Sequence, residues 1–199
     1  MTTPSNHYAS FLRLCRETRN QAQAKKLHCL IIKTVANPET FLYNNLINTY
    51  GKLGNTTYAR LVFDEIAQPN PFSWNIILSA YSDSGFLGKM QEVFNLMPTR
   101  DGVSWNSLIS GYARHGSAME AVEAYNLMLR EGVFNLNRIT FSTVLSLASS
   151  QGCIDLGRQR QKFFQLYKNS GALEGAGGSS PGERQLFFFL VDDSAGAVV

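Results

Sequence analysis

The side chains that most often do chemistry in proteins are few in this chain, and their spacing forms no catalytic or metal site. The sequence has three histidines and three cysteines. No two cysteines are spaced as C-x-x-C, so they cannot supply a four-ligand zinc site. The sequence also lacks H-E-x-x-H, G-x-S-x-G, G-x-x-x-x-G-K and the H-x-E with P-C-x-x-C of zinc deaminases. These absences predict a protein with no catalysis of its own, no metal and no cofactor.

Amide side chains, in contrast, recur at one spacing. Asn44, Asn75 and Asn106 are 31 residues apart, and each directly follows an aromatic residue. An amide both donates and accepts hydrogen bonds. If the aromatic residue is buried on a helix, the next residue lies about 100° around the helix axis. We therefore expect these amides to lie outside the core and to face along one surface.

The elements that carry these amides are copies of one repeat. Five segments share an apolar pattern and start with an aromatic residue, at Tyr8, Tyr43, Trp74, Trp105 and Phe141. Apolar residues three, four and seven positions after this aromatic residue mark one face of a helix. Eleven positions later four segments have a glycine, which favours the left-handed turn that ends a helix. These glycines are Gly54, Gly85, Gly116 and Gly152, and the first segment has Arg19 there.

A second apolar stripe follows each of the first four turns. It begins at Ala24, Ala59, Met90 and Ala121 and again has helical spacing. Each repeat is thus predicted to be a helical hairpin, and neither helix can bury its stripe alone. Stacked hairpins bury a continuous core, so the expected fold is all-α, an α-solenoid of helix-turn-helix repeats.

The strings NNLINTYGKLGNTTYARLVFDEI and VSWNSLISGYARHGSAMEAVEAYNLMLREG resemble pentatricopeptide repeats. The repeat lengths resemble the order of the plant PLS subclass: an L repeat over 5–39, S repeats over 40–70 and 71–101, a P repeat over 102–137 and a degenerate L repeat over 138–168. The array covers 5–159, and a tail without repeats, over 169–199, has the composition of a disordered linker. Tetratricopeptide repeats, which bind peptides, are the nearest alternative, but their period is constant at about 34 residues.

The resemblance implies that paired residues each select one RNA base. The pairs are Asn44 with Asn70, Asn75 with Asp101, and Asn106 with Asn137, and they resemble codes for pyrimidine, uridine and pyrimidine. It also implies that side chains three positions before the selecting amide wedge between bases, namely Phe41, Phe72, Val103 and Ile139. Phe41 and Phe72 have an alternative place between adjacent hairpins.

The charge distribution suits an anionic partner for the array. Residues 1–171 have 17 basic and 11 acidic side chains, a net charge of +6, while residues 172–199 have a net charge of −3. No apolar run approaches the roughly 18 residues of a membrane span, so no membrane partner is expected. We expect a monomer that binds single-stranded RNA.

The resemblance extends this expectation to a role in organelles. It implies RNA processing or C-to-U editing in mitochondria, with chloroplasts second, and a deaminase or editing factors supplied by other molecules. The chain is similar to the N-terminal repeats of proteins that end in a deaminase-like domain, and it is expected to be a truncated form. Two alternatives stay open: a protein-interaction scaffold, and a truncated product without function.

Overall fold

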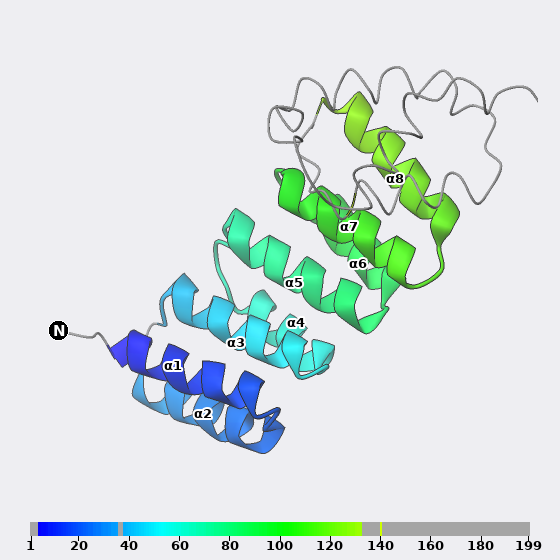
Figure 1. Cartoon of the computed structure of the whole chain (residues 1–199). Coiled ribbons are helices and arrows are strands. Elements are labelled where there is room, and N and C mark those ends of the chain that lie inside the picture. Colours follow the sequence, from blue (N-terminus) through cyan, green and yellow to red (C-terminus); the bar gives the residue numbers. More distant parts are fainter. Residues whose placement is uncertain (1–3, 36–37, 133–139, 141–199) are drawn as a thin grey trace, which may run out of the picture. The chain divides into compact units, whose positions relative to one another are not determined.

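The computed structural model describes residues 4–35, 38–132 and 140, and this part of the chain is helical, with short turns between helices. The helices are α1 (Pro4–Glu17), α2 (Gln21–Thr34), α3 (Thr40–Lys52), α4 (Thr56–Asp64), α5 (Pro71–Ser84), α6 (Leu87–Leu96), α7 (Gly102–Arg114) and α8 (Ala118–Arg130) (Figure 1). The chain divides into two units, Met1–Thr140 and Phe141–Val199, and every described residue lies in the first. The degenerate L repeat and the tail therefore lie almost wholly outside the described residues.

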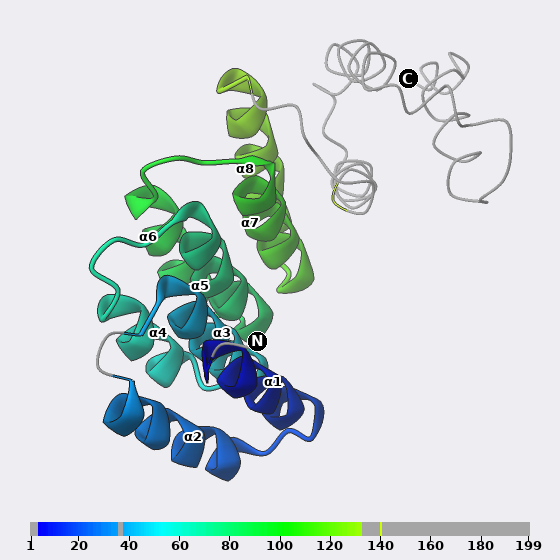
Figure 2. The same cartoon turned by 90° about the vertical axis from the view of Figure 1, so that its left-hand side faces the viewer.

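Consecutive helices pair into hairpins, and the hairpins stack in chain order. α1 packs on α2, α3 on α4, α5 on α6 and α7 on α8. The odd-numbered helices also pack on one another, α1 on α3, α3 on α5 and α5 on α7 (Figures 1 and 2). Each even-numbered helix from α2 to α6 contacts the next odd-numbered one. The expected all-α fold, an α-solenoid of helical hairpins, is confirmed.

The two apolar stripes form the core. The first stripe is buried in α3, α5 and α7, at Leu46, Ile47, Tyr50, Ile77, Leu78, Tyr81, Leu108, Ile109 and Tyr112. In α1, Leu12 and Cys15 are buried, but Phe11 is 53% exposed. The second stripe is buried in all four hairpins except at His28, which is half-buried. A hydrogen bond of 3.0 Å joins His28 Nδ1 to the Tyr50 hydroxyl oxygen, so the polar ring has a partner at the core's edge.

The helix ends follow from local sequence signals. The side chains of Asn20, Asn55, Asn70 and Asp101 each accept a hydrogen bond from a backbone N–H three residues later, so that they cap α2, α4, α5 and α7. The predicted glycine turns are present at Gly54, Gly85 and Gly116, where φ is 75°, 75° and 82°. Arg19 takes the same left-handed conformation in the first hairpin, with a φ of 50°.

Aromatic pairs join successive hairpins. The rings of Phe63 in α4 and Trp74 in α5 meet edge to face at 4.8 Å. Phe94 in α6 and Trp105 in α7 repeat this arrangement at 4.6 Å, and both pairs have an interplanar angle of 69°. Such pairs contribute about 0.5–1.5 kcal/mol beyond the area they bury. The repeated contact holds α5 and α7 at equivalent places on the hairpins that precede them.

Candidate nucleic-acid interface

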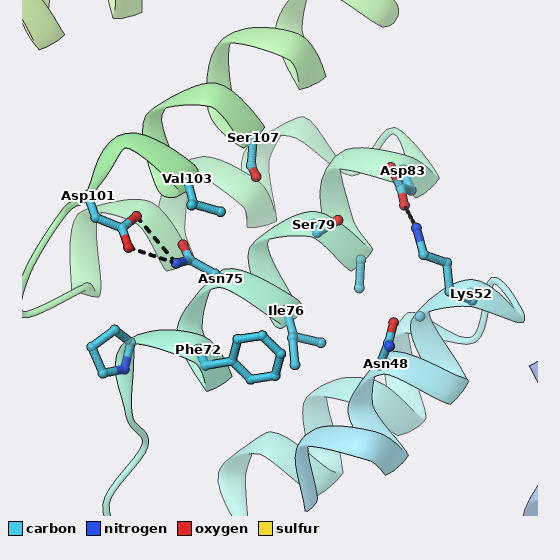
Figure 3. A pocket seen from close by; sticks show the side chains of 13 residues that line it. Asn48, Lys52, Phe72, Asn75, Ile76, Ser79, Asp83, Asp101, Val103 and Ser107 are labelled. Carbon is cyan, nitrogen blue, oxygen red and sulfur yellow. Dashed lines mark hydrogen bonds and ion pairs between the residues drawn. The ribbon is translucent and has the colours of Figure 1, made fainter. Parts of the chain in front are cut away.

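A groove of about 500 Å³ runs over α3, α5 and α7 (Figure 3). Every side of it comes from these odd-numbered helices or from residues that cap them. Its lining consists of Asn48, Gly51, Lys52, Pro71, Phe72, Asn75, Ile76, Ser79, Ala80, Asp83, Asp101, Val103 and Ser107. Four residues predicted from the sequence to contact RNA are among them: Phe72, Asn75, Asp101 and Val103.

The predicted pair Asn75 and Asp101 meets at one end of this groove. Asn75 Nδ2 lies 3.3 Å from Asp101 Oδ1 and 3.2 Å from Asp101 Oδ2, within hydrogen-bond distance of both (Figure 3). Asp101 Oδ1 also accepts from the backbone N–H of Ser104 at 2.9 Å, and the Ser104 hydroxyl accepts from the N–H of Asp101 in return. This capping box holds the Asp101 carboxylate in place. The pair therefore fixes the Asn75 amide nitrogen against the Asp101 carboxylate at the groove, while Asn75 Oδ1 is buried.

Asn44 differs from Asn75 although it has the same place in its repeat. Asn44 is only 3% exposed, and its Oδ1, like that of Asn75, is buried with no hydrogen-bond partner among the described residues. The expectation that this amide stays out of the core is wrong for Asn44, because neighbouring side chains close over it. Its predicted partner Asn70 caps α5, where Asn70 Oδ1 accepts from the N–H and the hydroxyl of Ser73 at 2.9 and 3.0 Å. The selection of a base by this pair stays a prediction.

Asn106 is half-buried on α7, and its Nδ2 donates to the carbonyl oxygen of Gly102 one turn earlier. Its predicted partner Asn137 lies outside the described residues, as does the predicted wedge residue Ile139. The structure therefore does not test the third pair.

The three other predicted wedge residues are exposed. Phe41 is 48% exposed, Phe72 64% and Val103 57%. These side chains are therefore not buried between hairpins, which was the alternative for the two phenylalanines. Phe72 and Val103 lie beside Asn75 in the groove, with Ile76 one turn after Phe72 on α5 (Figure 3). An exposed apolar surface beside a hydrogen-bonding pair suits the faces and edges of a nucleobase.

A charged cluster at the other end of the groove was not predicted from the sequence. Lys52 Nζ lies 2.7 Å from Asp83 Oδ2, and Arg114 Nη1 lies 2.8 Å from Asp83 Oδ1. Burial raises the pKa of Asp83, but hydrogen bonds and charge from Lys52 and Arg114 outweigh it, so its pKa lies below the usual value. A usable sequence signal exists, because all three residues stand nine positions after the aromatic residue of their repeats.

The part of the chain that the structure describes contains no group of three or more His, Cys, Asp or Glu side chains that could hold a metal ion. In the same residues, no helix has the length and apolar character needed to cross a membrane.

Comparison with known proteins places these hairpins in a family. A family model described as the PPR repeat matches residues 41–68, 72–101 and 103–133. The pentatricopeptide repeat-containing protein At1g68930 of Arabidopsis thaliana is 59% identical over 158 residues, which are 78% of this chain and 21% of that protein. A mitochondrial relative from the same plant, At3g53360, is 37% identical over 57 residues, which are 29% of this chain and 7% of that protein. The chain thus spans a small part of the length of these relatives.

Solved structures share the fold at low identity. PPR10 from maize, in complex with an 18-nt psaJ RNA element, has a TM-score of 0.65 and 18% identity over 79% of this chain and 24% of that one. The PPR domain of Arabidopsis thaliana protein-only RNase P 1, in complex with tRNA, has a TM-score of 0.67 and 12% identity over 94% of this chain and 98% of that one. From the stacked hairpins, the three matched repeats and these relatives, residues 41–133 form pentatricopeptide repeats, and the chain is similar to plant proteins that contain them.

Proposed function

We propose that this protein binds single-stranded RNA along the groove over α3, α5 and α7 and has base preference there. The observation that carries the proposal is the Asn75 and Asp101 pair, fixed by a helix cap and flanked by the exposed apolar side chains of Phe72 and Val103. Hydrogen-bonding groups beside stacking surfaces are what proteins use to recognise unpaired bases. PPR10 and the RNase P domain, which share the fold, are solved with RNA and tRNA.

The proposal extends to a role without catalysis. The chain supplies binding in organellar RNA processing or C-to-U editing, and a deaminase in another molecule supplies the chemistry. The PLS order of repeats and a mitochondrial location belong to the same proposal. The mitochondrial relative At3g53360 supports the location.

Binding of the purified full chain to short RNAs at fixed salt tests the proposal. We expect tighter binding to a pyrimidine-rich strand containing uridine than to a purine-only strand. Replacing Asn75 with Ala should reduce this preference by about 1–3 kcal/mol, because one base loses its hydrogen-bonding partner. Asn95→Ala is the matched control, since Asn95 is an exposed amide on α6 outside the groove. Equal affinity of the unchanged chain for both strands would refute base preference.

The apolar centre of the groove, around Phe72, Ile76 and Val103, favours a second candidate, a scaffold that binds a peptide. This candidate predicts that a partner protein stays on the immobilised chain after nuclease treatment. The Phe72→Ser variant should lose this partner, and the Asn75→Ala variant should keep it.

A further inference from the structure

The groove has an electrostatic feature that does not suit a polyanion. Among its described lining residues, the charged side chains are Lys52, Asp83 and Asp101, one basic and two acidic. A phosphodiester backbone needs cations along its path, because phosphate contacts supply most of the affinity that does not depend on base identity. The positive charge near the groove is instead held by an acid. We call Lys52, Asp83 and Arg114 the Asp83 cluster.

Asp83 bridges two cations from neighbouring helices. Lys52 in α3 bonds to Oδ2 at 2.7 Å, and Arg114 in α7 bonds to Oδ1 at 2.8 Å, so each carboxylate oxygen is occupied. Arg114 is held further by the Ser82 hydroxyl at 3.2 Å and the Ser110 carbonyl oxygen at 3.4 Å. The carboxylate thus lies between two cations that reach it from either side. A phosphate group accepts the same charge-assisted hydrogen bonds from Lys and Arg.

Asp83 lies on the same helix as Asn75, the amide predicted to select a base. Asp83 follows Asn75 by eight residues, which is about 12 Å along α5. Figure 3 shows Asp83 and Lys52 at the opposite end of the groove from Asn75 and Asp101, with Ile76 and Ser79 between them. An RNA strand that places one base against Asn75 and follows the groove therefore brings its phosphates to the Asp83 cluster.

We propose that Asp83 restrains phosphate binding in this groove: its carboxylate occupies Lys52 and Arg114, and RNA phosphate must compete with it for both cations. The inference rests on the proposed function. The competition lowers the part of the affinity that does not depend on base identity and leaves the contacts at Asn75 and Asp101 unchanged. Removing the negative charge of Asp83 frees two cations for the RNA backbone.

The test compares Asp83→Asn with Asp64→Asn in the full chain. Both remove one negative charge, but Asp64 pairs with Arg60 on α4 and does not line the groove. The pyrimidine-rich and purine-only RNAs are titrated at several salt concentrations. We expect Asp83→Asn to tighten binding of both RNAs roughly threefold to tenfold at low salt. The slope of log affinity against log salt should steepen by about 0.7 for each additional phosphate that the protein neutralises. The preference between the RNAs stays at the wild-type value.

Two outcomes overturn this inference. An equal gain in both variants would mean that net charge alone sets the affinity. A loss of affinity in a folded Asp83→Asn variant, with folding checked by thermal unfolding, would mean that Asp83 positions its cations for RNA. Lys52→Gln gives an independent measurement if Asp83→Asn does not fold: we expect less than about a twofold loss of affinity, and a tenfold loss contradicts the inference. Absence of RNA binding by the unchanged chain refutes the proposed function itself, before any variant is compared.

Discussion

At the residue scale, Asp101 and Asn70 have one observed role and one predicted role. Both were predicted to select bases, and both also cap the first helix of the following hairpin. The N-cap position favours Asn, Asp, Ser and Thr, because a short side-chain oxygen satisfies a free backbone N–H. The helix start alone therefore restricts the residues that can stand at the end of a repeat. The base selection predicted for this position is thus limited to residue types that also cap a helix.

Substitutions at Asp101 should separate the helix cap from the predicted base selection. Asp101→Ala should lower stability by about 1 kcal/mol, because α7 loses its cap, whereas Asp101→Asn should leave stability nearly unchanged, because Asn caps as well as Asp. Both variants should change the uridine preference, because each removes the carboxylate beside Asn75. Denaturant midpoints and RNA titrations measure the two effects.

Asn55→Ala is the control for Asp101, since Asn55 caps α4 through the N–H of Tyr58 at 3.2 Å and lies outside the groove. It should cost a similar amount of stability and leave RNA preference unchanged. An Asp101→Ala variant as stable as the unchanged chain would show that the cap contributes little.

At the scale of the helices, small residues let the odd-numbered helices approach one another. A Cβ built on Gly51 in α3 would lie 2.7 Å from the Cβ of Ala80 in α5. A Cβ on Gly111 in α7 would lie 2.6 Å from the Ser82 hydroxyl of α5 and 2.5 Å from the sulfur of Met90. Equivalent positions thus meet at both interfaces. The spacing of the groove over these helices depends on side chains too small to separate them.

Gly111→Ala should therefore destabilise the protein by about 1–3 kcal/mol, because the added methyl group overpacks the contact between α5 and α7. Gly88→Ala is the matched control on α6, where an added Cβ meets nothing within 4 Å. That variant should be neutral or more stable by up to about 1 kcal/mol, because alanine loses less backbone entropy in a helix. Denaturant midpoints measure both, and equal effects of the two substitutions would contradict close packing at Gly111.

At the scale of the whole molecule, the described hairpins contact mainly their sequence neighbours. Stability in such arrays is close to a sum of repeat and interface contributions. The α1–α2 hairpin packs on α3 on one side, while Phe11 and Leu14 of α1 are each 53% exposed. Fewer contacts hold this hairpin than hold α3 to α6, which have neighbours on both sides.

Amide hydrogen exchange should follow this difference. We expect faster exchange in α1 and α2 than in α3 to α6, because local opening of an end hairpin breaks one interface rather than two. Mass spectrometry of peptides from each hairpin measures the rates. Leu12→Ala, which empties a fully buried position in α1, should accelerate exchange in α1 and α2 and leave α7 unchanged. Uniform protection, or a uniform response to this substitution, would indicate a single cooperative unit instead.

The sequence by itself was sufficient to predict the hairpins, their order, the two buried stripes and the turns at Gly54, Gly85 and Gly116. These features depend on interactions within one repeat: helical periodicity, caps, and a backbone conformation that glycine adopts easily. The resemblance to pentatricopeptide repeats also implied RNA contacts at Phe72, Asn75, Asp101 and Val103, and these four residues line one groove. Local rules repeated along the chain are readable from the chain alone.

Only the tertiary structure decided which of the equivalent residues are accessible. Asn44 and Asn75 share one offset, yet Asn44 is 3% exposed while Asn75 lines the groove and bonds to Asp101. Asp83 likewise draws its two cations from helices about 31 residues away on either side. Burial and charge pairing depend on how side chains of different repeats fit together. The repeat period gives residues equivalent positions on their helices, but the packing of side chains between repeats decides which neighbours surround each residue.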